Sequence, residues 1–141
     1  MKFEVIGTPV AKGRPRLGKF GTYTPTKTIN YENLVKISYL KKYKNQETII
    51  GPTKINIIAI FPIPKSYSKK QREYILKENN YHTKKSDIDN ICKIILDALN
   101  GLAYNDDTQI LKIIAEKKYT FEQEKVNIIN KNNEKRNNKW S

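Results

Sequence analysis

All five aspartates of the chain lie within 21 consecutive residues, whereas lysine is the dominant charged residue elsewhere. Asp87 and Asp89 are separated by one residue, Asp97 follows, and Asp106 and Asp107 are adjacent. Carboxylate oxygens are the ligands that Mg²⁺ and Mn²⁺ prefer in proteins, and these ions often bridge a carboxylate to a substrate phosphate. Two or three of these side chains with open coordination positions would therefore form a metal site for phosphodiester chemistry.

Both acidic pairs also have an ordinary structural explanation. Aspartate is favoured at helix N-termini and in turns, so one pair would cap a helix and the other would occupy a turn. Lys93 lies four residues after Asp89, which suits either an i, i+4 ion pair or an ammonium directed at a scissile phosphate. Asp97 follows Lys93 at the same spacing and is predicted to hold the lysine in place. Asp106 is predicted to lie next to the metal site. The spacing alone leaves both interpretations open.

The elements that must position these residues are a helix and the strand after it. The helix is predicted to begin near Asp87 and to end before Gly101, a residue that suits a C-terminal cap. A core-facing stripe at i, i+3, i+4, i+7 and i+8 comprises Ile91, Ile94, Ile95, Ala98 and Leu99. A strand is predicted over residues 109–115, and a helix returning alongside it would bring the two acidic pairs together.

The remaining segments predict a single α+β domain with a small mixed sheet of about four strands and two to three helices. Further strands are expected over residues 2–6, 54–61 and 126–129 because of their β-branched or alternating composition. A helix with Asn30 as its cap is expected over 28–44, and a short helix should follow the capping-box sequence that starts at Ser68. Residues 1–129 would form this domain, and the Asn- and Lys-rich residues 130–141 are typical of a disordered tail.

The chain is strongly basic, with 27 Lys and Arg against 14 Asp and Glu and a formal net charge of +13. Counterion release makes such a surface suit DNA or RNA. An anionic membrane would satisfy the same charge, but no apolar run approaches the ~20 residues of a spanning helix. Gly13 and Pro15 should keep Lys12, Arg14 and Arg16 on an extended loop, where they either reach phosphates or are simply solvated.

Several other residues have weaker signals. Tyr23 and Tyr31 lie near the basic loop, where they would either stack on an exposed base or pack in the core. The only histidine, His82, is expected to be a solvent-exposed loop residue. The only cysteine, Cys92, is expected to be a buried apolar side chain, and it excludes an internal disulfide. A cytoplasmic location is expected, since the segment MKFEVIGTPV also lacks the apolar stretch of a signal peptide.

The segment KKSDIDNICKIILDALNGLAYNDDTQI, residues 84–110, closely resembles the signature of the RusA-type Holliday junction resolvases, which prophages often carry. The stretches VIGTPVAKGRPR, YTPTKTINYE and FPIPKSYSKKQRE are similar to the family's N-terminal and middle patterns. The resemblance implies a small homodimeric endonuclease that uses Mg²⁺, with Mn²⁺ as a substitute, to nick four-way DNA junctions symmetrically in recombination and repair. It implies neither a small-molecule cofactor nor a membrane partner.

By motif, the resemblance makes Asp87, Asp89 and Asp107 metal ligands and Lys93 a catalytic lysine. One departure is Ser86, where many members have proline, so the approach to the first ligand lacks a rigid φ angle. Two alternatives stay open: a non-catalytic basic module that binds DNA, and a metal-dependent nuclease that acts on flaps, forks or RNA.

Overall fold

Strand β4 (Thr53–Pro62) is the centre of the domain, and alternate residues along it are buried. The computed structural model describes residues 1–130. In it β4 pairs in parallel with β5 (Ile110–Thr120) and antiparallel with β6 (Lys125–Asn130), which pairs antiparallel with β1 (Lys2–Ile6). The strand order β1-β6-β4-β5 confirms the predicted mixed four-stranded sheet of an α+β domain. Strand β5 continues beyond the predicted residue 115.

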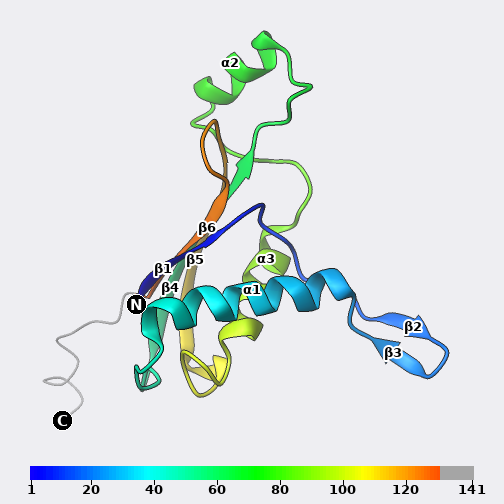
Figure 1. Cartoon of the computed structure of the whole chain (residues 1–141). Helices are drawn as coiled ribbons and strands as arrows, with labels where there is room; N and C mark the ends of the chain where they lie inside the picture. Colours follow the sequence, from blue (N-terminus) through cyan, green and yellow to red (C-terminus); the bar gives the residue numbers. More distant parts are fainter. Residues whose placement is uncertain (131–141) are drawn as a thin grey trace, which may run out of the picture.

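Helices α1 (Thr26–Tyr43) and α3 (Ile88–Leu99) cover one face of this sheet (Figure 1). The predicted stripe of α3 is confirmed, and Cys92 is buried beside it as expected. Gly101 follows the C-cap residue with φ +77°, a left-handed conformation in which a side chain would be strained. Helix α3 is therefore attached to the sheet along its length by apolar contacts that the sequence period predicted.

Helix α1 differs from the prediction in its start and its buried face. Its N-cap is Pro25, whose carbonyl accepts from the backbone N–H groups of Thr28 and Ile29, so the predicted cap Asn30 was wrong. Its buried residues are Thr28, Tyr31, Val35 and Tyr39. The apolar residues Leu34, Ile37 and Leu40 are exposed instead, because they lie outside this buried stripe. Tyr31 is consequently a core residue that cannot stack on a nucleobase.

Helix α2 (Lys69–Lys77) lies at the end of the molecule farthest from α1 (Figure 1). Its predicted capping box is confirmed: the Ser68 hydroxyl accepts from the Gln71 N–H at 3.1 Å, and the Gln71 side chain accepts from the Ser68 N–H at 2.7 Å. Only Ile75 of this helix is buried, so the caps contribute much of its local stability.

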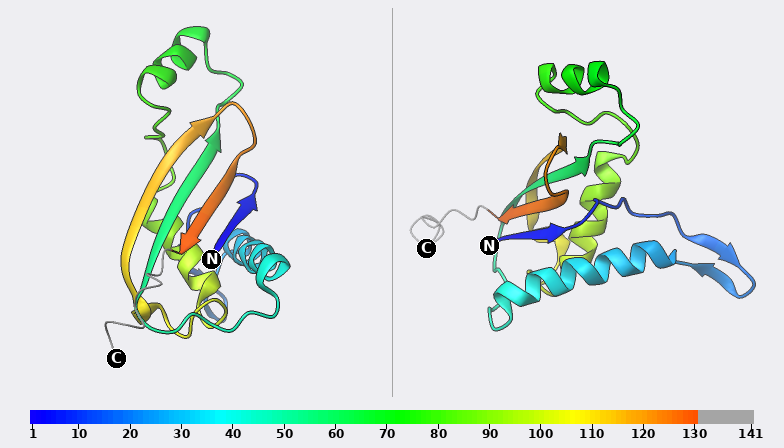
Figure 2. Two further views of the ribbon diagram at one scale, coloured as in Figure 1. Left: turned by 90° about the vertical axis from the view of Figure 1, so that its left-hand side faces the viewer. Right: turned by 45° about the horizontal axis from the view of Figure 1, so that its top comes forward.

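A two-stranded hairpin, which the sequence analysis did not predict, precedes α1. Strand β2 (Arg16–Gly18) pairs antiparallel with β3 (Gly21–Tyr23), and Gly18 faces Gly21 at the turn. The hairpin projects from the domain beyond the start of α1, as two views agree (Figures 1 and 2). Arg16 thus begins a strand, while Lys12 and Arg14 remain in the irregular segment that was expected.

The C-terminal strand β6 ends at Asn130, one position past the predicted domain boundary. The predicted tail over residues 131–141 lies outside the described residues. Among residues 1–130, no helix is long and apolar enough to cross a membrane.

Candidate functional site

The start of α3 presents two carboxylates that the fold itself does not use. Asp87 is the N-cap residue, but its side chain forms no capping hydrogen bond, and Asp89 follows in the first turn. Both residues are exposed. Within residues 1–130 neither side chain takes part in a hydrogen bond or an ion pair. Capping therefore does not explain these two aspartates, and both remain open to a cation.

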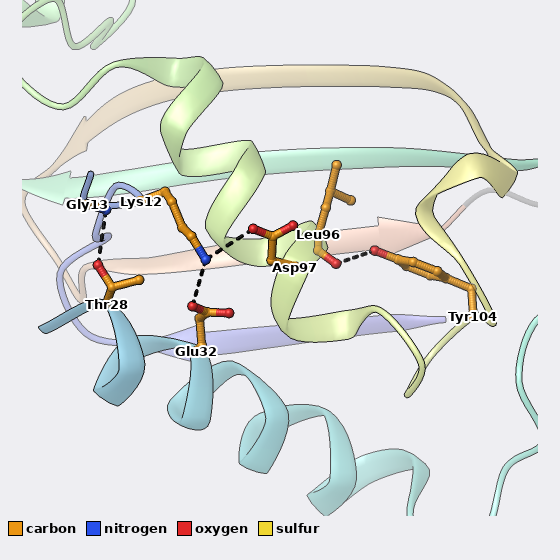
Figure 3. Close-up of polar contacts among 7 residues, drawn as sticks. All are labelled: Lys12, Gly13, Thr28, Glu32, Leu96, Asp97 and Tyr104. Atoms are coloured by element: carbon orange, nitrogen blue, oxygen red, sulfur yellow. Dashed lines mark hydrogen bonds and ion pairs between the residues drawn. The ribbon is translucent and has the colours of Figure 1, made fainter. Parts of the chain in front are cut away.

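Lys93 is exposed one turn further along α3 and forms no ion pair with any described residue. The predicted contact between Lys93 and Asp97 is absent from this part of the chain, because the Asp97 carboxylate accepts from Lys12 at 3.1 Å (Figure 3). Asp97 is half-buried, and its carboxylate is stabilised more by the half-buried ammonium of Lys12 than it would be by the exposed ammonium of Lys93. Asp97 thus joins α3 to the N-terminal segment.

Lys12 is the centre of this junction between three parts of the chain (Figure 3). Its ammonium donates to Glu32 of α1 at 2.9 Å, and its backbone N–H donates to the Asn90 carbonyl of α3. Burial by itself lowers the pKa of Lys12, but the hydrogen bonds to Glu32 and Asp97 outweigh burial and raise that pKa overall. Lys12 was expected either to reach phosphates or to be solvated, whereas its ammonium is engaged within the protein; Arg14 and Arg16 are exposed.

Replacing Lys12 with methionine is expected to lower the free energy of unfolding by about 2 kcal/mol, since two half-buried carboxylates would lose their counterion and repel each other. The loss should be smaller than for a fully buried pair because solvent screens these groups. Urea unfolding followed by circular dichroism measures the change. Arg14→Met, at an exposed neighbouring position, is the matched control and should unfold like the unmodified protein. Equal stability of the two variants would show that the junction contributes nothing.

The second acidic pair lies in a loop that one side chain holds in place. The loop ends in a short 3₁₀ turn (Asp107–Gln109). The Gln109 side-chain oxygen accepts from the N–H groups of Asn105 and Asp106, at 2.9 and 3.1 Å. Its amide nitrogen donates to the carbonyls of Ile49 and Gly51, at 2.8 and 3.1 Å. This role of Gln109 was not predicted, although glutamine three residues after Asp106 is a recognisable capping spacing.

The two adjacent aspartates have pKa values shifted in opposite directions. The pKa of Asp107 is raised, first because its carboxyl shares a hydrogen bond with Asp106 and further because Asp106 and Asp97 repel its charge. The pKa of Asp106 is lowered, chiefly by the Thr108 hydroxyl, which donates to it at 3.0 Å. Asp107 therefore lies in a locally negative environment within a basic chain.

Tyr104 and Lys117 connect the two acidic segments to the domain. The buried Tyr104 hydroxyl donates to the Leu96 carbonyl of α3 at 2.5 Å and secures the turn that leads to Asp107 (Figure 3). The Lys117 ammonium of β5 donates to the carbonyls of Lys84 and Ser86, at 2.9 Å each. Lys117 thus restrains the residue before Asp87, where Ser86 lacks the rigid φ angle of a proline. No sequence signal pointed to Lys117.

The two acidic segments stay apart within one chain. Among the described residues, no group of three His, Cys, Asp or Glu side chains could hold a metal ion. The prediction that the returning helix would gather them was wrong for the single chain. Asp87 precedes α3 and Asp107 follows it, and twelve helical residues span about 18 Å. Oxygen ligands suited to Mg²⁺ are thus present in type, but a single copy does not assemble three of them.

His82 is buried, so the expectation of an exposed loop residue was wrong. Its ring stacks on Phe61, with centroids 4.0 Å apart, and contacts Tyr119 at 4.6 Å. The backbone N–H of His82 donates to the Lys117 carbonyl, which draws the loop onto β5. Desolvation, and then the charge of Lys117, lower the pKa of His82 to about 4. The ring is therefore neutral and packs as part of the core.

Acidification is expected to destabilise the protein between about pH 6.5 and pH 4 through His82. The unfolded chain binds a proton on this imidazole near pH 6.5, whereas the folded chain does so only near pH 4, so stability falls as the pH falls across that window. The contribution should reach about 3 kcal/mol at most. His82→Phe keeps an aromatic ring without a titrating group, and its midpoint in urea should depend less on pH. Identical pH dependence would exclude this origin.

This is a small α+β domain with two unpartnered carboxylates at the start of α3, in a strongly basic chain whose charge suits a nucleic-acid substrate. The family model described as "Endodeoxyribonuclease RusA" matches residues 7–129. The Bacillus subtilis (strain 168) protein YqaN, described as uncharacterized, is 36% identical over 128 residues, which cover 86% of this chain and 89% of that protein. The chain belongs to the RusA endodeoxyribonuclease family and is a nuclease, which confirms the predicted resemblance.

Proposed function

We propose that this protein is a Mg²⁺-dependent, structure-selective endodeoxyribonuclease that resolves four-way DNA junctions by paired symmetric nicks in recombination and repair. The observation that carries the proposal is the pair Asp87 and Asp89. Both side chains are exposed and unpartnered among the described residues, and the chain belongs to a family of endonucleases. The single buried cysteine is compatible with a reducing compartment, so action in the cytoplasm belongs to the same proposal.

Each site residue has a separate role in the proposed reaction. Asp87, Asp89 and Asp107 would hold Mg²⁺, or Mn²⁺ in its place, and the bound ion supplies activation of water and stabilisation of charge on the phosphate. Lys93, exposed and without an ion pair in the described part of the chain, would place its ammonium against the scissile phosphate. Asp97 acts through Lys12 in orienting α3, and Asp106 shapes the loop that presents Asp107.

Arg14 and Arg16 are the proposed backbone contacts outside the acidic site. Both are exposed, and Lys12 anchors the start of their segment to α1 and α3. Phosphate contacts of this kind orient DNA and contribute affinity without reading its sequence. Selectivity should therefore depend on the shape of the junction more than on its bases.

A homodimer is part of the proposal because one copy does not bring the three ligands together. Strand β5 is at the edge of the sheet, and Leu111 and Ile113 on it are 58% and 42% exposed. An edge with apolar side chains is suited to pairing with a second copy. Antiparallel pairing of two β5 strands about a two-fold axis near Ile113 would bring the partner's Asp107 level with Tyr119, two residues beyond Lys117, whose ammonium holds the Ser86 carbonyl next to Asp87. Each site would then combine Asp87 and Asp89 of one copy with the partner's Asp107.

The direct test is incubation of the purified protein with end-labelled four-way junction in Mg²⁺. Duplex, flap, replication-fork and RNA substrates of matched length are assayed in parallel, and EDTA provides the metal-free control. Symmetric incision of the junction, in preference to the other substrates, is the expected result. Equal cleavage of flaps or RNA would show a broader nuclease activity in place of junction resolution. Metal-independent binding without any incision would show that the protein is a DNA-binding module.

A further inference from the structure

The tip of the β2–β3 hairpin carries an aromatic side chain with no structural use in the fold. All residues from Arg16 to Tyr23 are exposed, and Phe20 at the turn is 98% exposed. Leu17 on β2 is 87% exposed. The hairpin extends away from the sheet and α1 (Figure 2), so these side chains face solvent at the far end of a projection. Exposed phenylalanine at such a position is costly in water unless a partner covers it.

The hairpin presents this ring on a defined turn. Lys19 and Phe20 form the tip between Gly18 and Gly21, and Gly21 has φ +112°, which a residue with a side chain rarely adopts. The ring of Tyr23 lies over Gly18 so closely that an added Cβ would stand 3.0 Å from the ring atom Cδ1. The two glycines therefore allow the tight turn, and the Tyr23 ring packs against Gly18.

The charge around the tip selects a polyanion as its partner. No acidic residue occurs between Glu4 and Glu32, whereas Arg14, Arg16 and Lys19 are all exposed in this stretch. The Lys19 ammonium lies 5.9 Å from the centroid of the Phe20 ring, so a cation and an aromatic face are offered together. Phosphates would bind the cations, and the ring would bind the face of a base, since stacking on an aromatic side chain tolerates every base.

Stacking by Phe20 requires a base whose face is accessible. In continuous duplex each base is covered by its neighbours, and exposing one costs unstacking energy. At the branch point of a junction the stack is interrupted, so a projecting ring can reach a base face there at a lower cost. A residue that contacts only such faces would distinguish branched DNA from duplex.

We propose that the β2–β3 hairpin enters the branch point of its DNA substrate, where Phe20 stacks on an exposed base while Arg16 and Lys19 bind the flanking phosphates. This inference rests on the proposed function for its substrate, and it identifies the residue that recognises the branch. The hairpin acts in binding and distortion, and the acidic residues that cut lie on other elements. A second copy of the chain is the competing occupant of the hairpin tip.

The test compares Phe20→Ala with the unmodified protein in EDTA, so that binding is measured without incision. Phe121→Ala is the matched control, because Phe121 is a 54% exposed phenylalanine in the loop between β5 and β6, outside the hairpin. Fluorescence anisotropy should show junction affinity reduced about tenfold or more by Phe20→Ala, with duplex affinity changed less than about twofold. 2-Aminopurine at the junction centre should change its fluorescence on binding the unmodified protein and Phe121→Ala, but not on binding Phe20→Ala.

Three other outcomes would overturn the inference, and they are distinguishable. If the unmodified protein cuts junctions in Mg²⁺ but Phe20→Ala keeps both its junction preference and the 2-aminopurine signal, the hairpin inference fails and the proposed function stands. If Phe20→Ala changes the sedimentation of the protein from dimer to monomer, the tip is a contact between copies. If the unmodified protein neither prefers nor cuts junctions, the proposed function fails and the hairpin inference fails with it.

Discussion

Replacing Asp89 with asparagine is expected to reduce Mg²⁺-dependent cleavage of a four-way junction by about a thousandfold or more. Removing a charged ligand from a catalytic ion forfeits several kcal/mol of transition-state stabilisation, and each 1.4 kcal/mol is a factor of ten in rate. Stability should not change, because the Asp89 side chain has no hydrogen bond or ion pair within residues 1–130. Single-turnover cleavage of labelled junction measures the rate, and thermal unfolding checks the fold.

The controls for Asp89→Asn separate loss of chemistry from loss of binding. Junction affinity in EDTA should be equal to or slightly higher than that of the unmodified protein, since the variant loses one negative charge near the DNA. Glu73→Gln removes another exposed acid, on α2, and the cleavage rate of this variant should be unchanged. Full cleavage by Asp89→Asn would exclude the ligand role and leave Asp89 as an ordinary acidic residue in the first turn of α3.

Mixing two inactive variants, Asp89→Asn and Asp107→Asn, is expected to restore incision from almost none to a substantial fraction of the unmodified rate. In a site built from both copies, each homodimer of either variant lacks a ligand in both sites. The mixed dimer concentrates both defects in one site and leaves the other with its full set of carboxylates. That dimer should nick one strand of the junction, so the mixture should yield nicked junctions and little paired resolution. The variants are mixed after mild denaturation and joint refolding, and products are resolved on denaturing gels.

The matched control for the mixing experiment is the pair Asp87→Asn and Asp89→Asn. Both residues come from the same acidic segment, so every combination of these two variants leaves both sites damaged and no incision should return. If the Asp89 and Asp107 variants also fail to restore each other while sedimentation shows mixed dimers, each site belongs to one copy. Ile113→Arg tests the proposed edge separately, because a charge at the centre of the pairing should release monomers that do not cleave.

Local periodicity and capping chemistry made several elements predictable from the sequence. The apolar stripe of α3 and the buried alternation of β4 follow from helical and strand repeats, and both were confirmed. The box formed by Ser68 and Gln71 was also confirmed, because its two hydrogen bonds join residues three positions apart. Phe20 and its hairpin escaped prediction, since strands of three residues have too short a pattern to recognise.

The sequence by itself determined which residues carry acidic and basic chemistry and which helix presents Asp87 and Asp89. Only the tertiary structure decided that Lys12 pairs with Asp97 and that His82 is buried under β5. It also decided that one copy keeps the two acidic segments apart. The physical reason is range: repeats and caps depend on neighbours within one or two turns, whereas these contacts depend on how distant segments pack. The aspartates can therefore be identified along the chain, but how they lie relative to one another depends on how the helices and strands pack.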